Sequence, residues 1–150
     1  MKILSPLVCA LALLLSCSLI CVTATAEEKI HKVAVHVDEN DPKLMNMALN
    51  NVANLKKYYD SVGEKVEIEL VAYGPGLHMF RADTSPVIQR ISAMSLEIDN
   101  LTFSACANTH AAMTKKAGKE ITLVEEAGMV PSGVVQLIHL QEQGYAYIRP

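Results

Sequence analysis

The sequence lacks any cluster of basic residues, and this absence limits the partners that the protein can have. Its 150 residues include 13 Lys and Arg against 16 Asp and Glu, a formal net charge of −3, and the basic residues nowhere form a run. Proteins that bind nucleic acid neutralise phosphates with clustered Lys and Arg side chains. The sequence therefore argues against a nucleic-acid partner.

Motifs of several enzyme classes are also missing. There is no Gly-x-Gly-x-x-Gly pattern, and in the glycine-rich stretch at residues 74–76 Pro75 removes an N–H donor that a phosphate cradle needs. No Ser-His-Asp order and no paired-carboxylate motif stands out, which disfavours a hydrolase. We therefore expect no dinucleotide site, no hydrolytic centre, no bound cofactor and no resident metal.

Charge is almost absent from the first 26 residues. Lys2 is the only charged side chain there, an apolar run covers residues 3–22, and small residues end the segment at Ala24-Thr25-Ala26. This pattern is typical of a secretory signal peptide cleaved after Ala26. Cleavage leaves residues 27–150, which are 124 residues with 12 basic and 16 acidic side chains and a formal charge of −4. We expect one domain and a periplasmic or otherwise exported location.

Two other interpretations of this first segment stay open. The apolar run approaches the roughly 20 residues that span a bilayer, so the segment is also compatible with an uncleaved anchor. Residues 14–17 resemble the lipobox of a lipoprotein, with Cys17 as the lipidated residue, although Leu15 fits that pattern poorly.

Cysteine is scarce in the remaining chain. Cys9, Cys17 and Cys21 belong to the predicted signal peptide, so Cys106 alone remains after cleavage. Exported proteins usually use cysteines in disulfides, but a single cysteine has no partner within its own chain. Cys106 is therefore free, joined to another chain, or chemically active.

Strand patterns and helix patterns alternate along the chain. Residues 32–37 are short and β-branched, which predicts a buried strand, and Asp41 and Pro42 then match the N-cap and first position of a helix. Apolar residues keep helical spacing over residues 44–62, and a second strand is predicted over residues 66–73. This βαβ unit implies parallel strands whose following loops meet at one edge of a sheet.

The later part of the chain continues the alternation. A helix is predicted to begin at Ser85 and Pro86, followed by a strand over residues 101–105 and a helix opened by Cys106. A short strand over residues 121–124 and an apolar loop over residues 129–133 come next. The last predicted elements are a helix capped by Ser132 and ending at Gly144, and a strand over residues 145–148. The buried face of the last helix is predicted to hold Val134 or Val135, Ile138, and Gln141 or Glu142. The predicted fold is a single-domain α/β sandwich of Rossmann-like or flavodoxin-like type, with an open, mostly parallel sheet of four or five strands and helices on both faces.

The position of Cys106 at the start of a helix favours reactivity. A helix N-terminus supplies partial positive charge and free N–H groups, which stabilise a thiolate. Asn108 and Thr109 lie in the first turn, and His110 lies one turn further on. The alternative is that Cys106 is a small buried apolar residue, as free cysteines often are. We expect Cys106 to be the catalytic residue, with Asn108, Thr109 and His110 around its substrate.

The loop after the second predicted strand lies at the same edge of the sheet as Cys106. It covers residues 74–81 and contains Gly74, Gly76 and His78. Ligands of open α/β sheets bind at this edge. We therefore add these three residues to the predicted substrate site.

Four segments of the chain resemble the DsrE/DsrF-like family, which is linked to sulfur relay. They are residues 71–76 (VAYGPG), 103–109 (FSACANT), 131–135 (PSGVV) and 144–148 (GYAYI), and the resemblance covers residues 32–150. It implies an open α/β sheet, assembly into homotrimers or homohexamers, and a cysteine that carries sulfur as a persulfide. Only Cys106 corresponds to that cysteine. The relay members work in the cytoplasm, whereas this chain is predicted to be exported.

Three functions remain in competition at this stage. The first is a sulfur carrier, at most a sulfurtransferase-like protein, that exchanges sulfur between Cys106 and a thiol or sulfur-donor partner protein or a small sulfur compound. The second is a small-ligand or soft-metal module with His78, Cys106 and His110 as ligands. The third is an assembly protein with an incidental cysteine, supported by the apolar residues 129–131.

Overall fold

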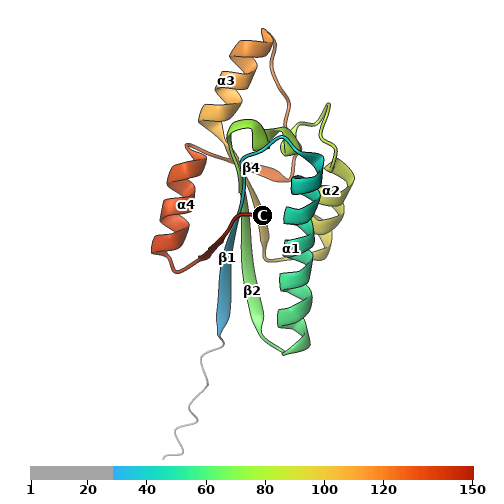
Figure 1. Ribbon diagram of the computed structural model, residues 1–150, viewed down its shortest axis with the longest axis vertical. Helices are drawn as coiled ribbons and strands as arrows, with labels where there is room; N and C mark the ends of the chain where they lie inside the picture. Colours follow the sequence, from blue (N-terminus) through green and yellow to red (C-terminus); the bar gives the residue numbers. More distant parts are fainter. Residues whose placement is uncertain (1–28) are drawn as a thin grey trace, which may run out of the picture.

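The computed structural model describes residues 29–150 (Figure 1). The predicted signal peptide, its cleavage site and Cys17 lie outside the described residues. The elements are β1 (Ile30–Val37), α1 (Pro42–Ser61), β2 (Lys65–Ala72), the 3₁₀ segment η1 (Gly74–Phe80), α2 (Ile88–Glu97), β3 (Leu101–Cys106), α3 (Ala107–Ala117), β4 (Ala127–Val130), α4 (Gly133–Glu142) and β5 (Ala146–Ile148).

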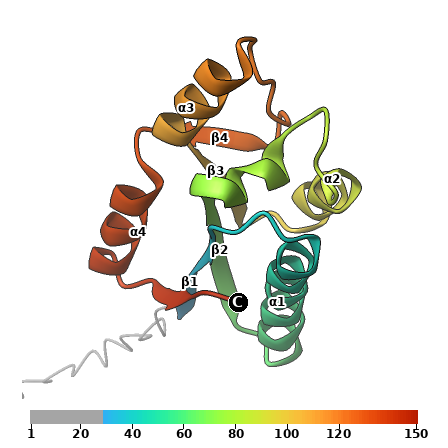
Figure 2. The same cartoon turned by 45° about the horizontal axis from the view of Figure 1, so that its top comes forward.

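The five strands form one sheet in the order β4-β3-β2-β1-β5, and all four pairings are parallel. Figure 1 shows α1 and α2 on one side of the sheet and α4 on the other, so the predicted fold class is confirmed. The third helix, α3, extends beyond the carboxyl end of the sheet, where Figure 2 also shows η1. The loops that the sequence assigned to one edge therefore lie together.

Helix α1 begins where the sequence predicted. The side chain of Asp41 accepts a hydrogen bond of 2.8 Å from the backbone N–H of Lys43, and Pro42 is the first helical residue. This cap satisfies one of the free N–H groups at the helix start, which contributes about 1 kcal/mol. The buried residues of the helix are Met45, Ala48, Leu49 and Val52, which keep helical spacing.

The main core lies between the sheet and the helices α1 and α2. In β1, Val33, Val35 and Val37 point into this core, whereas Ala34 belongs to a smaller cluster on the α4 side. Large side chains such as Phe80 are fully buried in the main core, and each contributes about 1.5–3 kcal/mol through loss of apolar surface to water. This packing holds η1, which contains Phe80, against the sheet.

The face of the sheet under α4 has a more polar interior. Ser104 donates a hydrogen bond of 2.6 Å to the carboxylate of Glu69, which also accepts one of 2.8 Å from the side-chain amide of Gln136 on α4. The hydroxyl of Tyr145 donates to the carboxylate of Glu67. These bonds satisfy groups that are costly to bury unpaired, so α4 is held by polar contacts as well as by Leu137 and Leu140.

The predictions for residues 121–133 were wrong in part. Residues 121–124 are not a strand, although Leu123 forms one antiparallel bridge with Arg81. The edge strand is instead β4, which takes up Met129 and Val130 from the predicted apolar loop and pairs with β3. An edge strand of four residues leaves too short a pattern to distinguish it from an apolar loop.

The predicted buried face of the last helix was also wrong. The buried residues of α4 are Gly133, Leu137 and Leu140, whereas Val134, Val135 and Ile138 are about half exposed. Gln141 and Glu142 are exposed as well. The physical reason is that α4 carries apolar residues on two faces, and the face with Leu137 and Leu140 is the one that packs against Ala34 and Val71 of the sheet.

The helix predicted from Ser85 begins slightly later, at Ile88. The hydroxyl of Ser85 instead donates a hydrogen bond to the carbonyl of Met79 in η1. Within residues 29–150, no helix has the length and apolar character needed to cross a membrane.

Gly76 marks the closest backbone approach in the fold. A Cβ atom at this position would lie 2.3 Å from the carbonyl oxygen of Val37, so no larger residue fits without moving η1 or β1. We predict that Gly76→Ala lowers the free energy of unfolding by about 1–3 kcal/mol, the usual cost of overpacking. Urea unfolding followed by circular dichroism measures this loss.

Gly128→Ala is the matched control for that substitution. A Cβ atom at Gly128 would lie 3.7 Å from the nearest atom, the carbonyl oxygen of Phe103, which is an ordinary contact. Its effect should stay within about 0.5 kcal/mol. Equal losses in the two variants would contradict the close approach at Gly76.

Candidate functional site

Cys106 ends β3 and is the N-cap residue of α3. Its Sγ atom accepts a hydrogen bond of 3.5 Å from the backbone N–H of Thr109, the third residue of the helix. The residue is 4% exposed. The thiol therefore takes the place of the oxygen that usually caps a helix, at the edge of the sheet where α/β proteins bind ligands.

The surroundings of Cys106 favour its thiolate form. Burial alone raises the pKa of the thiol, but the hydroxyl of Thr109 and the backbone N–H groups of Gly133, Thr109 and Asn108 lower it. Their combined effect is larger, so the pKa of Cys106 lies below its ordinary value. A lowered pKa increases the thiolate population near neutral pH, and the thiolate is the nucleophile.

Thr109 joins the two loops of the site. Its Oγ1 atom accepts a hydrogen bond of 2.9 Å from the backbone N–H of Gly74, at the start of the loop after β2. Gly74 has φ +54°, in the left-handed region that glycine adopts readily. The same hydroxyl group stabilises the thiolate of Cys106. The prediction that Gly74, Cys106 and Thr109 lie together is thus supported by a direct contact.

The start of α4 is a part of the site that the sequence did not assign. Cys106 pairs in register with Val130, so the chain leaving β4 runs beside the chain leaving β3. Three residues later Gly133 opens α4 with its N–H close to the thiol. The sequence predicted a helix capped by Ser132 and a family resemblance over residues 131–135, but no role in the site. Because residues 129–133 were predicted as a loop, the sequence did not show that this helix follows a strand beside Cys106.

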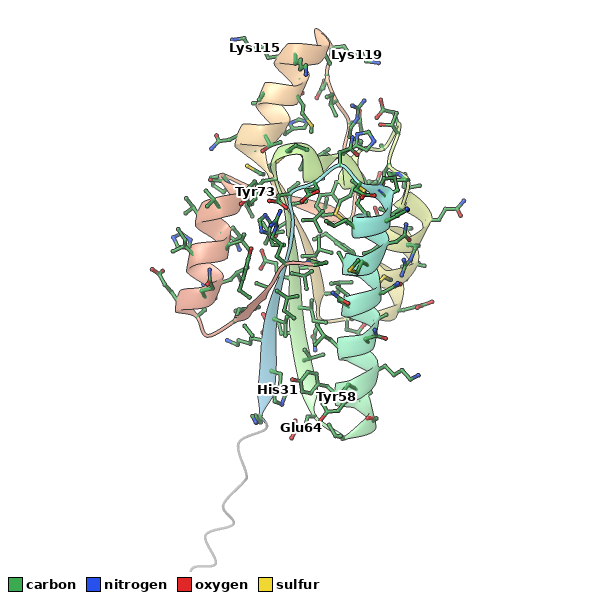
Figure 3. All side chains as sticks on the ribbon, in the orientation of Figure 1. His31, Tyr58, Glu64, Tyr73, Lys115 and Lys119 are labelled. Atoms are coloured by element: carbon green, nitrogen blue, oxygen red, sulfur yellow. The ribbon has the colours of Figure 1, made fainter. Side chains whose placement is uncertain are left out.

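Tyr73 and His36 form a second layer beside the thiol. Tyr73 lies at the carboxyl end of the sheet (Figure 3), and its ring stacks on that of His36 with 4.5 Å between centroids. Burial raises the pKa of Tyr73, and the charges of Asp38, Tyr147 and Cys106 raise it further. The effect of Cys106 on Tyr73 indicates that the phenol and the thiol are close in space.

His36 is buried and only partly satisfied. Its Nδ1 atom is hydrogen-bonded to the hydroxyl of Tyr147 at 2.8 Å, whereas its Nε2 atom has no hydrogen-bond partner and lies 4.0 Å from a carboxylate oxygen of Asp38. Burial lowers the pKa of His36 against the opposing effect of Asp38, so the neutral ring is favoured. In the sequence His36 was one more residue of an apolar strand.

The remaining predicted residues do not reach the thiol directly. Gly76 is packed against β1, as described above, and His78 donates from Nε2 to the carbonyl of Thr84 at 3.1 Å. His110 donates from Nε2 to the carbonyl of Ile121 at 2.6 Å. Asn108 is exposed beside the cysteine.

These positions remove the support for a soft-metal centre of His78, Cys106 and His110. The two histidines bond to different backbone segments through Nε2. Among the described residues 29–150, no group of three or more His, Cys, Asp or Glu side chains is arranged to hold a metal ion.

A cavity of about 820 Å³ opens beside the site, between η1 and α3. Its lining includes Gly74, His78, Asn108 and Thr109, four of the residues that the sequence predicted to bind substrate. Cys106 is not in the lining, but Thr109 contacts both the cavity and the sulfur. The arrangement is a buried thiol of lowered pKa, separated by Thr109 from a cavity large enough for a small organic molecule.

Comparison with known proteins identifies a family and a similar solved structure. The model of the DsrE/DsrF-like family matches residues 21–150. Among solved structures, a protein of unknown function from Methanobacterium thermoautotrophicum is similar, with 34% sequence identity and a TM-score of 0.69 over 80% of this chain and 99% of that chain. No curated protein matches the sequence.

The contact between Thr109 and Cys106 can be tested by substitution. Thr109→Val removes the hydroxyl, so the pKa of Cys106 should rise and its alkylation by iodoacetamide should begin at higher pH. The rate at neutral pH should fall about tenfold or more, because a hydrogen bond to a charged group contributes about 1.5–3 kcal/mol. Thr109→Ser keeps the hydroxyl and should retain most of the rate. Equal pH profiles for the two variants would show that the hydroxyl does not act on the thiol.

Proposed function

Because this chain belongs to the DsrE/DsrF-like family, which is linked to sulfur relay in general, we propose that it carries sulfur as a persulfide on Cys106. The observation that carries the proposal is the thiol of lowered pKa at the start of α3, beside the start of α4. A carrier needs a nucleophilic thiolate to accept sulfur and hydrogen-bond donors to hold the anion that forms. The hydrogen-bond donors around Cys106 meet both needs, because they favour the thiolate and are in place to bind the persulfide anion.

Loading requires no oxidant when the donor already holds sulfane sulfur. The thiolate of Cys106 attacks the outer sulfur of an organic persulfide R–S–SH. A bond forms between Sγ and that sulfur, the S–S bond of the donor breaks, and its electron pair leaves with R–S⁻. The proton stays with the transferred sulfur until the new persulfide ionises. Charge and oxidation state balance, since one thiolate is replaced by another.

Release is the same exchange in reverse. A thiolate of a partner protein or small molecule attacks the outer sulfur, and Cys106 leaves as a thiolate stabilised by Thr109 and Gly133. A low pKa of the leaving thiol favours this step. The proposed activity is therefore transfer between two thiols, with at most sulfurtransferase-like turnover, and the partner is a thiol or sulfur donor.

We also propose that the protein acts after export, in the periplasm or outside the cell. The support is the apolar N-terminal segment with its Ala-Thr-Ala end. In an oxidising compartment an exposed thiol forms disulfides readily. The burial of Cys106 fits such a setting, because it restricts access to ligands that enter at the carboxyl edge of the sheet.

An oligomer is the proposed state of assembly, a homotrimer or homohexamer. The support is the outer face of α4, which consists of the half-exposed side chains Val134, Val135 and Ile138. Apolar surface on a helix of a small domain is characteristic of a site of contact with another molecule. The face lies on the helix whose first residue approaches Cys106, so assembly would change the surroundings of the site.

Sulfur loading is tested by intact mass spectrometry of residues 27–150 after exposure to polysulfide. The expected result is an added sulfur mass confined to Cys106, with thiol blocking and peptide mapping to locate it. Cys106→Ala should fold normally and load nothing. An accessible, folded thiol that gains no sulfur would overturn the carrier proposal, and adducts that persist in Cys106→Ala would place the sulfur elsewhere.

Assembly is tested separately on the face of α4. Ile138→Glu puts a charge among apolar side chains and should convert the oligomer largely to monomer, as measured by light scattering after size exclusion. Leu96→Glu is the matched control, because Leu96 is 83% exposed on α2 and lies apart from this face. A wild-type chain that is already monomeric, or an Ile138→Glu chain that stays assembled, would exclude α4 as the interface.

A further inference from the structure

The cavity between η1 and α3 has a lining that selects for one class of ligand. Its volume of about 820 Å³ lies within the roughly 300–1,000 Å³ typical of small-molecule sites. Part of the wall is apolar and consists of Pro75, Ala112, Met113, Ala117 and Ile121. Such a wall suits a ligand with an organic body.

The charged side chains of the lining are all basic. Arg81 and Lys116 line the cavity, His78 adds an imidazole, and no Asp or Glu is among the lining residues. Arg81 is paired with Asp83, which holds the pKa of that carboxyl at about 2. Lys116 has no ion pair or hydrogen bond within residues 29–150. An unpaired ammonium group beside an apolar wall attracts an anionic group of a ligand.

The cavity also reaches the sulfur site through shared residues. Asn108 and Thr109 line it and belong to the first turn of the helix that Cys106 caps, and Gly74 lines it while donating to Thr109. A ligand in contact with Thr109 therefore touches a residue whose backbone N–H is hydrogen-bonded to Sγ.

We propose that this cavity binds an amphipathic organic anion, a low-molecular-weight thiol or persulfide with an acidic group held by Lys116 and an apolar part against α3. That this anion exchanges sulfur with Cys106 rests on the proposed function; that the cavity binds it does not. The exchange is the one given above, in which R–S–SH loses its outer sulfur and R–S⁻ remains. Small inorganic sulfur anions would leave the apolar wall and most of the volume unused.

Two dyes that share an aromatic body test the binding step. Anilinonaphthalene sulfonate carries an anionic group, and N-phenylnaphthylamine lacks it. Fluorescence titration should show that Lys116→Gln weakens the sulfonate about twofold to fivefold, the range of one solvent-exposed ion pair, while the neutral dye is unaffected. Lys115→Gln is the matched control, because Lys115 is the adjacent residue at the far end of α3 (Figure 3) and does not line the cavity.

A second pair of variants tests the apolar wall. Ala112→Glu places a carboxylate in the cavity and should weaken the sulfonate by about tenfold or more, whereas Ala111→Glu, exposed on the same helix outside the lining, should not. Equal effects in the two variants, or loss of dye binding in Ile138→Glu at the face of α4, would overturn the assignment of the cavity.

The connection to Cys106 has its own measurement. Dithiobis(nitrobenzoate) is an anionic aromatic disulfide and dithiodipyridine is a neutral one, and both release a coloured thiol when a thiolate attacks. The ratio of their rates should fall in Lys116→Gln and stay unchanged in Lys115→Gln. If Lys116→Gln left this rate ratio unchanged while the dye still bound, ligands in the cavity would not be the ones that react with Cys106. Dye binding that survives when neither polysulfide nor an organic persulfide loads Cys106 would sink the carrier proposal and leave the cavity standing.

Discussion

The parallel pairing of β3 with β4 is the constraint on which the site depends. It sets Cys106 beside Val130, so that two strands end at the same level and the helices after them begin close together. Helix α3 starts directly at the cysteine, and α4 starts at Gly133, whose N–H group approaches the same sulfur. Positive partial charge from two helix starts acts on one thiol. Among the described residues, the groups that lower the pKa of Cys106 are a hydroxyl and backbone N–H groups, and none of them is a charged side chain.

The glycines keep this edge of the sheet compact. Gly76 allows η1 to pass against the end of β1, and Gly133 allows α4 to begin against the ring of Tyr73, where a Cβ atom would lie 2.7 Å from the ring carbon Cδ1. With η1 in place, Gly74 reaches Thr109 and closes the site from the side of β2. The position of the thiol, the hydrogen bond that supports it and the neighbouring cavity therefore follow from the same close packing.

Much of the fold was predictable from the sequence, because β1, α1, β2 and β3 carry long or well-bounded patterns. Asp41 and Pro42 marked the start of α1 correctly, and Cys106 was correctly placed at the start of α3. The sequence patterns gave wrong predictions where tertiary contacts determine the structure. The short edge strand β4 resembles an apolar loop, and α4 carries apolar residues on two faces, of which the one with Leu137 and Leu140 packs against Ala34 and Val71, far away in the sequence. The partners of His36 could not be predicted for the same reason, since Tyr73, directly after β2, and Tyr147, in β5, are far from it in the sequence.

The sulfur of Cys106 is both the reactive atom and the cap of α3, and this double role ties two equilibria together. Any change in the chemical state of the sulfur alters the acceptor to which the N–H group of Thr109 donates its hydrogen bond. Conversely, fraying of the first turn of α3 removes hydrogen-bond donors that favour the thiolate. Linkage requires the two effects to be reciprocal. Helix α3 buries none of its own residues, and its first turn is held by the hydrogen bonds of Thr109 and His110 as well as by the cap at Cys106. A change in the charge of the sulfur atom therefore changes the stability of this turn, and the order of the turn changes the pKa of the thiol.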